Sequence, residues 1–246
     1  KSVFGSSKDV EPPLPCIQNR EILSVLQKFK RAKEQSPPNP PYRTSLMWHE
    51  TNSQKEGLIT RNVRFAKSSD EFIASGPNIG LCSPCQKTAR SNCKKKGDYD
   101  VVDLTAIPST YLPRTNYSLN AEAQKEWINS LKVCTRSMLG VGGERTLRSA
   151  LLPASSMHIS GCFSISSQNA KWLIGLCAAL SSIPFDFLVR TLAKANMGKD
   201  IIEMLPYISP SSSILTRATC LNCASEWYSE AWAEVWSEDF KKEKWS

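Results

Sequence analysis

The sequence predicts a mixed α/β fold, in which a short-stranded sheet is packed against helices. Apolar residues recur at helical spacing in several segments, whereas residues 58–65 and 158–165 alternate as strands do. The regular strand–helix succession of a doubly wound fold does not occur in this pattern. At 246 residues and 41% hydrophobic content, the chain can build one large domain or two small ones.

The first 44 residues predict an N-terminal helix and a Pro-rich linker. Between residues 20 and 35, Ile22, Leu26 and Phe29 fall on one helical face. Four prolines within residues 36–41 then end the helix, because proline cannot continue it. We therefore expect a boundary at residue 44 and an α/β domain over residues 45–246.

The next segment predicts short strands separated by loops. Residues 58–65 alternate, with Ile59, Val63 and Phe65 on the same face as Arg61. Further along, the composition predicts a Gly/Pro/Ser/Lys loop over 76–98, a short buried strand over 101–107, another loop over 108–120 and a helix over 121–138.

The C-terminal half predicts one hairpin followed by helices. Residues 148–152 and 158–165 would pair around the turn at 153–156. Helices are expected over 168–181 and 185–196, on either side of Pro184. A last helix over 223–242 carries an aromatic residue every four positions, a stripe typical of a core or partner-packing face: Tyr228, Trp232, Trp236 and Phe240.

The charge favours a polyanionic partner. The formal net charge is +8, and nucleic acid is favoured over an anionic membrane. Five cations cluster within ten residues, as in a phosphate-contacting loop or, equally, a solvated loop: Lys87, Arg90, Lys94, Lys95 and Lys96. Arg114 and Asn116 have the side chains that read guanine and adenine edges, although they could instead tie their loop to the core.

The chain predicts a cytoplasmic protein with no membrane contact. Its most apolar run, residues 172–183, is too short to span a bilayer and contains serines. No signal peptide is visible at its start. Nine cysteines spread along the chain are typical of reduced, mostly buried thiols rather than a disulfide scaffold.

The tetrapeptide Asn39-Pro40-Pro41-Tyr42 spells the catalytic motif of amino-methylating adenine methyltransferases. In that chemistry the Asn and a Pro carbonyl accept the hydrogens of the exocyclic amine, and the Tyr stacks on the flipped base. The motif has to follow a buried parallel strand, whereas a charged helix end precedes it here. We keep catalysis by this motif as an alternative function.

Other motifs favour structural roles. Cys82/Cys85 and Cys220/Cys223 have the CxxC spacing of zinc ligands but lie far apart in the chain, so a shared structural zinc is a minor alternative and no metal is our main expectation. The run 140–143 is expected to be a flexible turn. Asp98, Asp100 and Asp103 are expected to cap a loop, since no Glu-x-Lys accompanies them as a metal-dependent nuclease would require.

Three segments together resemble the C-terminal target-recognition region of type IIG-like and DISARM-like bacterial DNA adenine methyltransferases. The resemblance covers about residues 45–240, and the chain departs from it at Cys82-Ser83-Pro84-Cys85, where the family has a Gly-Asn-Pro-like turn, and in a short segment between Tyr117 and Cys134. The segments are Trp48–Asn52 through Arg64-Phe65 with Ser75-Gly76-Pro77, then Asp98–Tyr117, then Gly143–Leu147, Ala150–Pro153, Ser182, Phe185–Arg190 and Leu205-Pro206.

The resemblance implies a chain that selects a DNA sequence and performs no chemistry itself. An upstream methyltransferase domain of the same polypeptide would bind S-adenosylmethionine, so no cofactor is expected in this chain. Double-stranded DNA would be the partner, and Arg61, Arg64 and Arg145 join the basic residues above as expected DNA contacts, with a buried structural role for Arg145 equally open. A further alternative is a protein-interaction module that docks through the aromatic stripe of residues 223–242.

Overall fold

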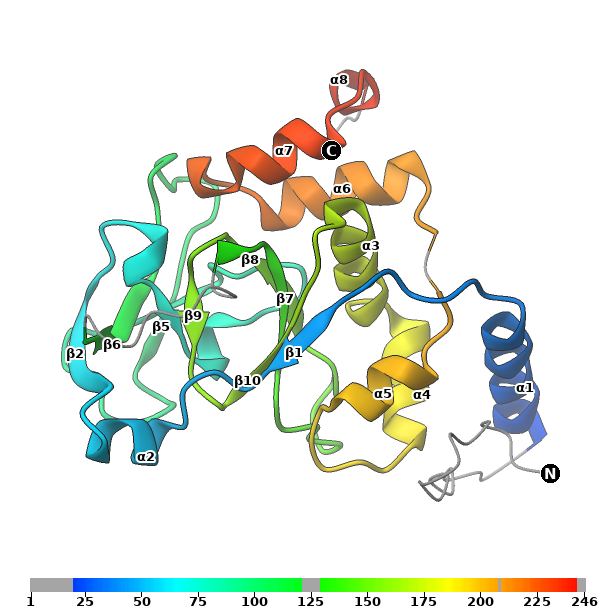
Figure 1. Cartoon of the computed structure of the whole chain (residues 1–246), viewed down its shortest axis with the longest axis horizontal. Helices are drawn as coiled ribbons and strands as arrows, with labels where there is room; N and C mark the ends of the chain where they lie inside the picture. The colour runs from blue at the N-terminus through cyan, green and yellow to red at the C-terminus, as the bar shows by residue number, and fades with distance from the viewer. Residues whose placement is uncertain (1–19, 121–128, 208, 243–246) are drawn as a thin grey trace.

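The computed structural model describes residues 20–120, 129–207 and 209–242, and confirms the mixed α/β class (Figure 1). Its largest sheet has four antiparallel strands in the order β1-β10-β7-β8. These strands are β1 (Arg43–Ser45), β10 (Cys162–Ser166), β7 (Lys132–Arg136) and β8 (Ser149–Leu152). The predicted features of residues 1–19 and 121–128 lie outside the described residues.

Helices cover one side of this sheet. Val133, Leu151 and Ile165 from the strands are fully buried against Leu173 and Cys177 of α3. Side chains with this apolar periodicity bury together because that removes them from water. The helices of this half are α3 (Ala170–Leu180), α4 (Ile183–Thr191), α5 (Lys199–Met204), α6 (Ser212–Asn222), α7 (Ser229–Val235) and α8 (Asp239–Lys242).

The N-terminal helix α1 (Arg20–Glu34) packs on the same core. Leu26 is fully buried, and the Phe29 ring meets Phe185 of α4 edge to face at 5.5 Å between centroids. After α1 the proline-rich stretch crosses to β1, and Tyr42 packs on Trp172 with ring centroids 5.6 Å apart. Residues 20–44 therefore share their hydrophobic core with the rest of the chain.

A second group of short strands lies beside the four-stranded sheet (Figure 1). The strands β2 and β6 pair antiparallel, as do β4 and β5, and β3 pairs with β9 in parallel. Trp48, Ile59 and Tyr117 form a separate small core in this part. The elements are α2 (Glu50–Lys55), β2 (Ile59–Phe65), β3 (Ile73–Ala74), β4 (Lys87–Ala89), β5 (Tyr99–Val101), β6 (Arg114–Leu119) and β9 (Met157–His158), with 3₁₀ turns at Ser69–Glu71, Gly76–Asn78 and Glu226–Tyr228.

The predicted strand over 101–107 is wrong. β5 ends at Val101, which pairs with Lys87 but is 73% exposed. The Asp103 carboxylate then accepts hydrogen bonds from the backbone N–H and the hydroxyl of Thr105, at 3.0 and 2.6 Å. This local turn competes with strand geometry, as Asp side chains commonly do.

Two loops were predicted where strands form. β4 lies inside the predicted loop 76–98, and β6 lies inside the predicted loop 108–120. In β6 the consecutive residues Thr115, Asn116 and Tyr117 are all buried, so hydrophobic alternation gives no signal there. The part of the predicted helix 121–138 that the structure describes is also wrong, because residues 132–136 form β7 in the middle of the large sheet.

The predicted hairpin has the right strands and the wrong pairing. β8 and β10 both form, yet each pairs with β7 and not with the other. The turn at 153–156 leads instead into β9, which pairs in parallel with β3. Pro184 lies in the first turn of α4, rather than between two helices, and Ser182 caps that helix.

The predicted helix over 223–242 is broken into three short pieces. Its start is tied elsewhere, since the Glu226 N–H donates to the Ser109 carbonyl at 2.9 Å. The chain also leaves helical geometry at Trp236, whose ψ is 133°. The aromatic residues still gather: the Trp236 ring stacks on Phe240 at 5.3 Å, and Trp232 lies 4.9 Å from Phe240.

Candidate nucleic-acid interface

The basic cluster of the sequence forms an ordered β4–β5 hairpin. Lys87 and Ala89 of β4 pair with Val101 and Tyr99 of β5, and residues 90–98 connect the two strands. We call residues 87–101 the basic hairpin. Residues 87–96 carry five cations and no acidic residue, so positive charge dominates the outer part of this hairpin.

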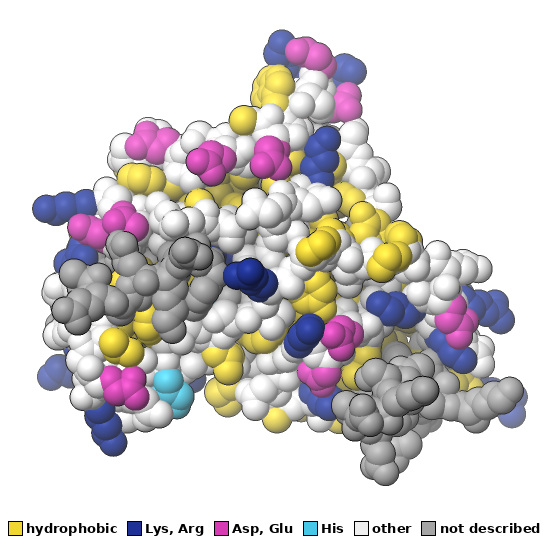
Figure 2. All heavy atoms as spheres, in the orientation of Figure 1, with side chains coloured by type: hydrophobic (Ala, Val, Ile, Leu, Met, Phe, Trp, Pro, Cys, Tyr) yellow, Lys and Arg dark blue, Asp and Glu magenta, His cyan; other side chains and the backbone are white. Residues whose placement is uncertain are grey.

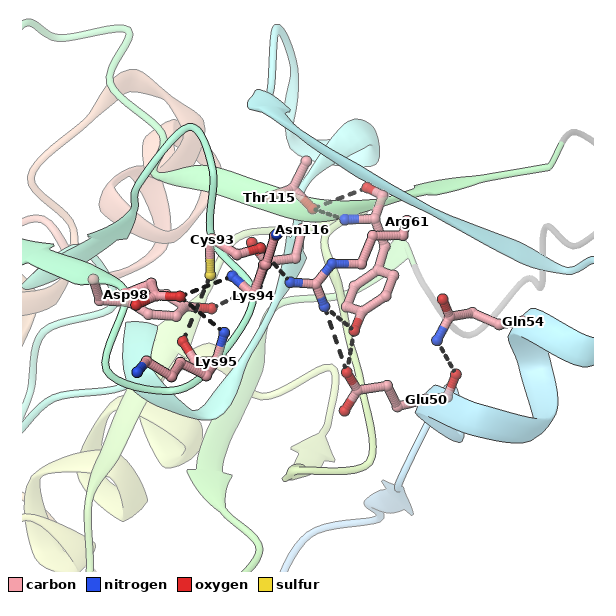
Figure 3. Close-up of polar contacts among 11 residues, drawn as sticks. Glu50, Gln54, Arg61, Cys93, Lys94, Lys95, Asp98, Thr115 and Asn116 are labelled. Carbon is pink, nitrogen blue, oxygen red and sulfur yellow. Dashed lines mark hydrogen bonds and ion pairs between the residues drawn. The ribbon is translucent and has the colours of Figure 1, made fainter.

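Asp98 organises the backbone beneath the lysines (Figure 3). Its carboxylate accepts hydrogen bonds from the N–H groups of Lys94 and Lys95, at 2.9 and 3.1 Å. These bonds favour the ionised form and hold the pKa of the Asp98 carboxyl below its ordinary value. The Lys94, Lys95 and Lys96 residues remain exposed, and no described acidic side chain forms an ion pair with them. The backbone is thus fixed while the ammonium groups are available.

Arg61 ties this loop to the β2–β6 pair (Figure 3). Its guanidinium donates to the Cys93 carbonyl at 2.6 Å and to the Tyr117 hydroxyl at 3.0 Å. It also lies 3.8 Å from a Glu50 carboxylate oxygen and 5.4 Å from the centroid of the Tyr117 ring. The Tyr117 hydroxyl in turn donates to Glu50, and burial followed by that carboxylate raises the tyrosine pKa. Arg61 is therefore an anchor of the hairpin.

Arg64 and Arg90 are each paired with an acid. Arg64 pairs with Glu71 and also donates to the Ser118 hydroxyl at 3.3 Å. The hydrogen bond from Arg64, followed by that from the Lys67 N–H, lowers the pKa of Glu71. Arg90 lies on the hairpin itself, with its Nε 2.9 Å from Asp100, and about half of each side chain is exposed. Such exposed pairs contribute little stability and can exchange partners easily.

Arg114 and Asn116 lie on β6, next to strand β4 of the basic hairpin. The Arg114 guanidinium stacks on the Phe65 ring at 4.1 Å and donates once, to the Ala89 carbonyl at 3.2 Å. Since a guanidinium has five N–H donors, most of its donors have no described partner. Asn116 is 6% exposed, and its amide donates to the Tyr99 hydroxyl at 2.7 Å. Asn116 thus lies in the interior of the β-rich part.

Arg145 lies apart from the other expected DNA contacts. It donates to the Ser181 carbonyl at 2.6 Å and lies 3.5 Å from the Asp186 carboxylate, between α3 and α4. Its side chain is 15% exposed, and that of Asp186 is 8% exposed. The Asp186 carboxylate also accepts from the Leu147 N–H at 2.6 Å. This geometry is that of a buried structural arginine, which was the alternative role expected for Arg145.

The nine other expected residues fall in one region. All of them lie between residues 61 and 116, on the joined strands β2, β4, β5 and β6 or on the loop of the basic hairpin. Three residues that were not among the expected site residues organise this region: Glu50, Tyr99 and Phe65. Each acts through a long-range contact, and composition alone carries no signal of such a contact.

The cysteines do not build a metal centre within the described residues. Cys82, Cys85 and Cys223 are buried thiols, and no described group of three or more His, Cys, Asp or Glu residues could hold a metal ion. Burial raises the pKa of the Cys85 thiol to about 12, which disfavours the thiolate that a zinc ion binds. The expected burial of most cysteines is confirmed for those described.

The Asn39-Pro40-Pro41-Tyr42 tetrapeptide precedes a strand rather than following one. It leads into β1, which pairs antiparallel with β10 at the edge of the sheet. The Pro41 carbonyl accepts a hydrogen bond from the Ser167 hydroxyl at 2.8 Å, and the Tyr42 ring packs on Trp172. The motif lacks the parallel-strand setting that its catalytic use requires.

The run 140–143 was expected to be a flexible turn, and it forms a turn after β7. Arg190 of α4 donates to the carbonyls of Val141 and Gly143, at 3.1 and 2.6 Å, which fixes the turn against the helices. Asp98 and Asp103 also accept local backbone hydrogen bonds, as the capping interpretation predicted.

Within the described part of the chain, no single helix is long and apolar enough to cross a membrane. α3 and α4 reach the required length and composition only as a pair, and that pair is bent by 71°.

Comparison with known proteins adds no relative. No protein-family model matches the chain, and neither the curated proteins nor the solved structures yielded a match.

Proposed function

We propose that this chain binds double-stranded DNA through the basic hairpin, as the sequence-specificity region of a bacterial DNA adenine methyltransferase of the restriction-modification or phage-defence type. The observation that carries the proposal is the concentration of five cations over residues 87–96 on a backbone held in place by Asp98 and Arg61. Several exposed cations on one ordered loop match the spaced phosphates of a duplex.

Positive charge is in excess in the segment that carries the basic hairpin. Residues 59–119 carry nine Lys and Arg residues against five Asp and Glu residues. In contrast, acidic side chains gather over α7, where Glu230 and Glu234 are exposed (Figure 2). Phosphates are attracted to the positive charge of residues 59–119 and repelled by the acidic side chains of α7. The duplex would therefore lie against the basic hairpin and away from the C-terminal helices.

In this mechanism DNA is bound by two kinds of contact, one to the phosphates and one to a base. Lys87, Lys94, Lys95 and Lys96 contact phosphates, while Arg114 is the best placed to read a base because most of its donors have no described partner. Its stacking on Phe65 fixes the plane of the guanidinium before DNA arrives. Arg61 and Arg64 position the strands through Cys93 and Glu71, and Asn116 does so through Tyr99.

Methyl transfer would belong to an upstream domain of the same polypeptide that binds S-adenosylmethionine. The setting of Asn39 and Tyr42 in front of an antiparallel edge strand supports this division, since it is unlike that of a methylation centre. This part of the proposal rests on the resemblance of residues 45–240 to target-recognition regions.

A salt titration of DNA binding tests the proposal. Changing Lys94, Lys95 and Lys96 together to Ala should weaken binding to every sequence and reduce the slope of log K against log salt by about 2 to 3, because about 0.9 counterion is released per neutralised phosphate. A matched control changes three exposed lysines of the helical half, Lys28, Lys171 and Lys199, to Ala and should leave the slope unaltered. An unaltered slope in the hairpin variant, or an equal change in the control, would refute the proposal.

A second candidate function is a protein-docking module, and one observation supports it. The Trp236 side chain is 53% exposed although it stacks on Phe240, which leaves an aromatic surface at the C-terminal helices. The partner would be the upstream methyltransferase domain. Trp236→Ala should then weaken association with that domain while DNA binding by this chain stays the same, and intact association would exclude this surface.

A further inference from the structure

One aromatic side chain lies exposed beside the basic hairpin. Phe65 is the last residue of β2, and 51% of it is exposed. Among the described aromatic residues, only Phe65 and Trp236 are more than half exposed, and Trp236 stacks on Phe240 in the helical half. Phe65 therefore carries the most accessible aromatic ring in the described β-rich part of the chain.

The Arg114 side chain connects the Phe65 ring to the basic hairpin. Phe65 and Arg114 face each other in the β2–β6 pair, and the guanidinium carbon lies 4.1 Å from the centroid of the ring. The same guanidinium donates to the Ala89 carbonyl of β4 at 3.2 Å, and the Arg114 backbone N–H donates to the Thr88 hydroxyl at 2.9 Å. Because the guanidinium lies over one face of the ring, a ligand reaches Phe65 from its remaining surface.

The ring has cations close to it, in keeping with the excess of Lys and Arg over residues 59–119. Most donors of Arg114 have no described partner, and Lys67, two residues after Phe65, is exposed. Arg64 and Glu71 pair with each other, so together they add no net charge. An accessible aromatic ring next to cations fits a ligand that has both a flat aromatic group and a negative charge. Nucleotides combine the two, since the base stacks on the ring and the phosphate pairs with the cations.

Base pairing determines which nucleic acid can use the ring. In a paired duplex each base is stacked between its neighbours, so that side chains in the grooves reach base edges. An aromatic side chain stacks on a base whose face is open, which requires an unpaired base. We propose that Phe65, held by Arg114, stacks on an unpaired base of the DNA that the basic hairpin binds. The inference rests on the proposed DNA binding and adds to it the class of DNA that is preferred, a duplex with an unpaired base.

Three DNA molecules that differ at one position test this site. The first is a fully paired duplex, the second carries one additional unpaired adenine in its middle, and the third carries an abasic residue in place of that adenine. The second and the third have the same backbone and charge, so their affinities differ only through the base. The wild-type chain should bind the unpaired adenine about 5- to 100-fold more tightly than the abasic residue, the range that stacking of one base on an aromatic side chain gives. Equal affinities would overturn the proposal.

Variants of Phe65 separate stacking from other contacts. Phe65→Ala and Phe65→Leu should bind the adenine and the abasic DNA equally, because neither side chain has an aromatic face, while Phe65→Tyr should keep the preference. Trp236→Ala is the matched control, since it removes the other exposed aromatic side chain and should keep the preference too. Retention of the preference in Phe65→Leu, or its loss in Trp236→Ala, would contradict the assignment. If Phe65→Ala lost affinity equally for the paired duplex, Phe65 would be a general duplex contact, which also overturns the proposal.

The paired duplex separates a failure of this inference from a failure of the proposed function. If the wild type binds it with a salt-dependent affinity and shows no preference between the adenine and the abasic residue, only the stacking on Phe65 is wrong. If the wild type binds none of the three DNA molecules, both are wrong. Because stacking releases no counterion, the preference should stay the same when the salt concentration is raised, whereas the affinity for all three molecules should fall. The wild-type comparison is independent of whether any variant folds.

Discussion

The Arg61 guanidinium reaches from β2 to donate a hydrogen bond to the Cys93 carbonyl at 2.6 Å. This contact joins the strand pair β2–β6 to the loop that carries the exposed lysines. Because Arg61 also bonds the Tyr117 hydroxyl of β6 and approaches Glu50 of α2, one side chain connects the loop to both of these elements.

Arg61→Ala should therefore loosen the basic hairpin. Loss of charge-assisted hydrogen bonds should lower the free energy of unfolding by about 2 kcal/mol, which urea denaturation would measure. Amide exchange of residues 90–98 should speed up, and DNA affinity should fall similarly for all sequences. The control is Asn62→Ala, which removes only an exposed bond to Ser118. A loss of affinity restricted to one DNA sequence would instead make Arg61 a base-reading residue.

The Asp98 carboxylate also orders this loop, and its effect depends on pH. Its hydrogen bonds from the Lys94 and Lys95 N–H groups lower its pKa, so the ordering is present above the unfolded-state pKa and is lost as the pH falls through the folded-state pKa. The loss lies below the ordinary value of 3.8. At neutral pH Asp98→Ala should therefore increase amide exchange at Lys94 and Lys95.

The control for Asp98 is Asp103→Ala, which removes the equivalent bond to the Thr105 N–H. It should loosen residues 103–106 and leave the exchange of Lys94 and Lys95 unaltered. Equal exchange in the two variants would mean that Asp98 does not order the lysine loop.

Three elements lie close to where the sequence predicted them, although their burial is periodic only in part. In α1 the buried Leu26 shares one face with Phe29. The alternation that predicted β2 does not match its burial, since only Ile59 is buried and Phe65 is 51% exposed, and α3 is buried on nearly every side. β7 was missed because it begins with Lys132 and ends with Arg136, which read as a polar segment. Lys132 is nevertheless fully buried, and its contacts are with carbonyls far along the chain.

The candidate site was predictable in its charge and not in its contacts. The cluster of cations over residues 87–96 is visible in the sequence. What the sequence could not supply is the partner of each arginine, since Arg61 and Arg145 bond residues more than 30 positions away. The aromatic stripe shows the same limit. Its period of four predicted one helix, whereas its start is tied to the Ser109 carbonyl and the chain leaves helical geometry at Trp236.

The buried Lys132 should make stability depend on pH above neutrality. Burial lowers the pKa of its ammonium to about 7, although its Nζ donates to the carbonyls of Pro153 and Ser156 at 3.2 and 3.0 Å. Above that value the folded chain releases a proton that the unfolded chain keeps until about 10.5, so the stability rises with pH. The limiting slope is about 1.4 kcal/mol per pH unit.

Lys132→Met is the variant that measures this slope. The free energy of unfolding of the wild type minus that of the variant should increase between pH 7 and 8.5. In this range the neighbouring His158 is already neutral in the folded chain, since burial lowers its pKa to about 4. A difference that stays flat with pH would show that Lys132 keeps its ordinary pKa in the folded chain.

Arg145 and Arg90 should respond to substitution in opposite ways. Arg145→Ala leaves the Asp186 carboxylate buried without its cationic partner, so we expect unfolding to become easier by about 3 kcal/mol while DNA affinity of the folded protein stays the same. Arg90→Ala removes a half-exposed cation from the basic hairpin, so stability should change by less than about 0.5 kcal/mol while DNA affinity falls. Urea denaturation and a DNA titration of both variants make the comparison. If Arg145→Ala lost affinity while still folded, the DNA surface would have to extend to α3 and α4, because Arg145 lies between those helices.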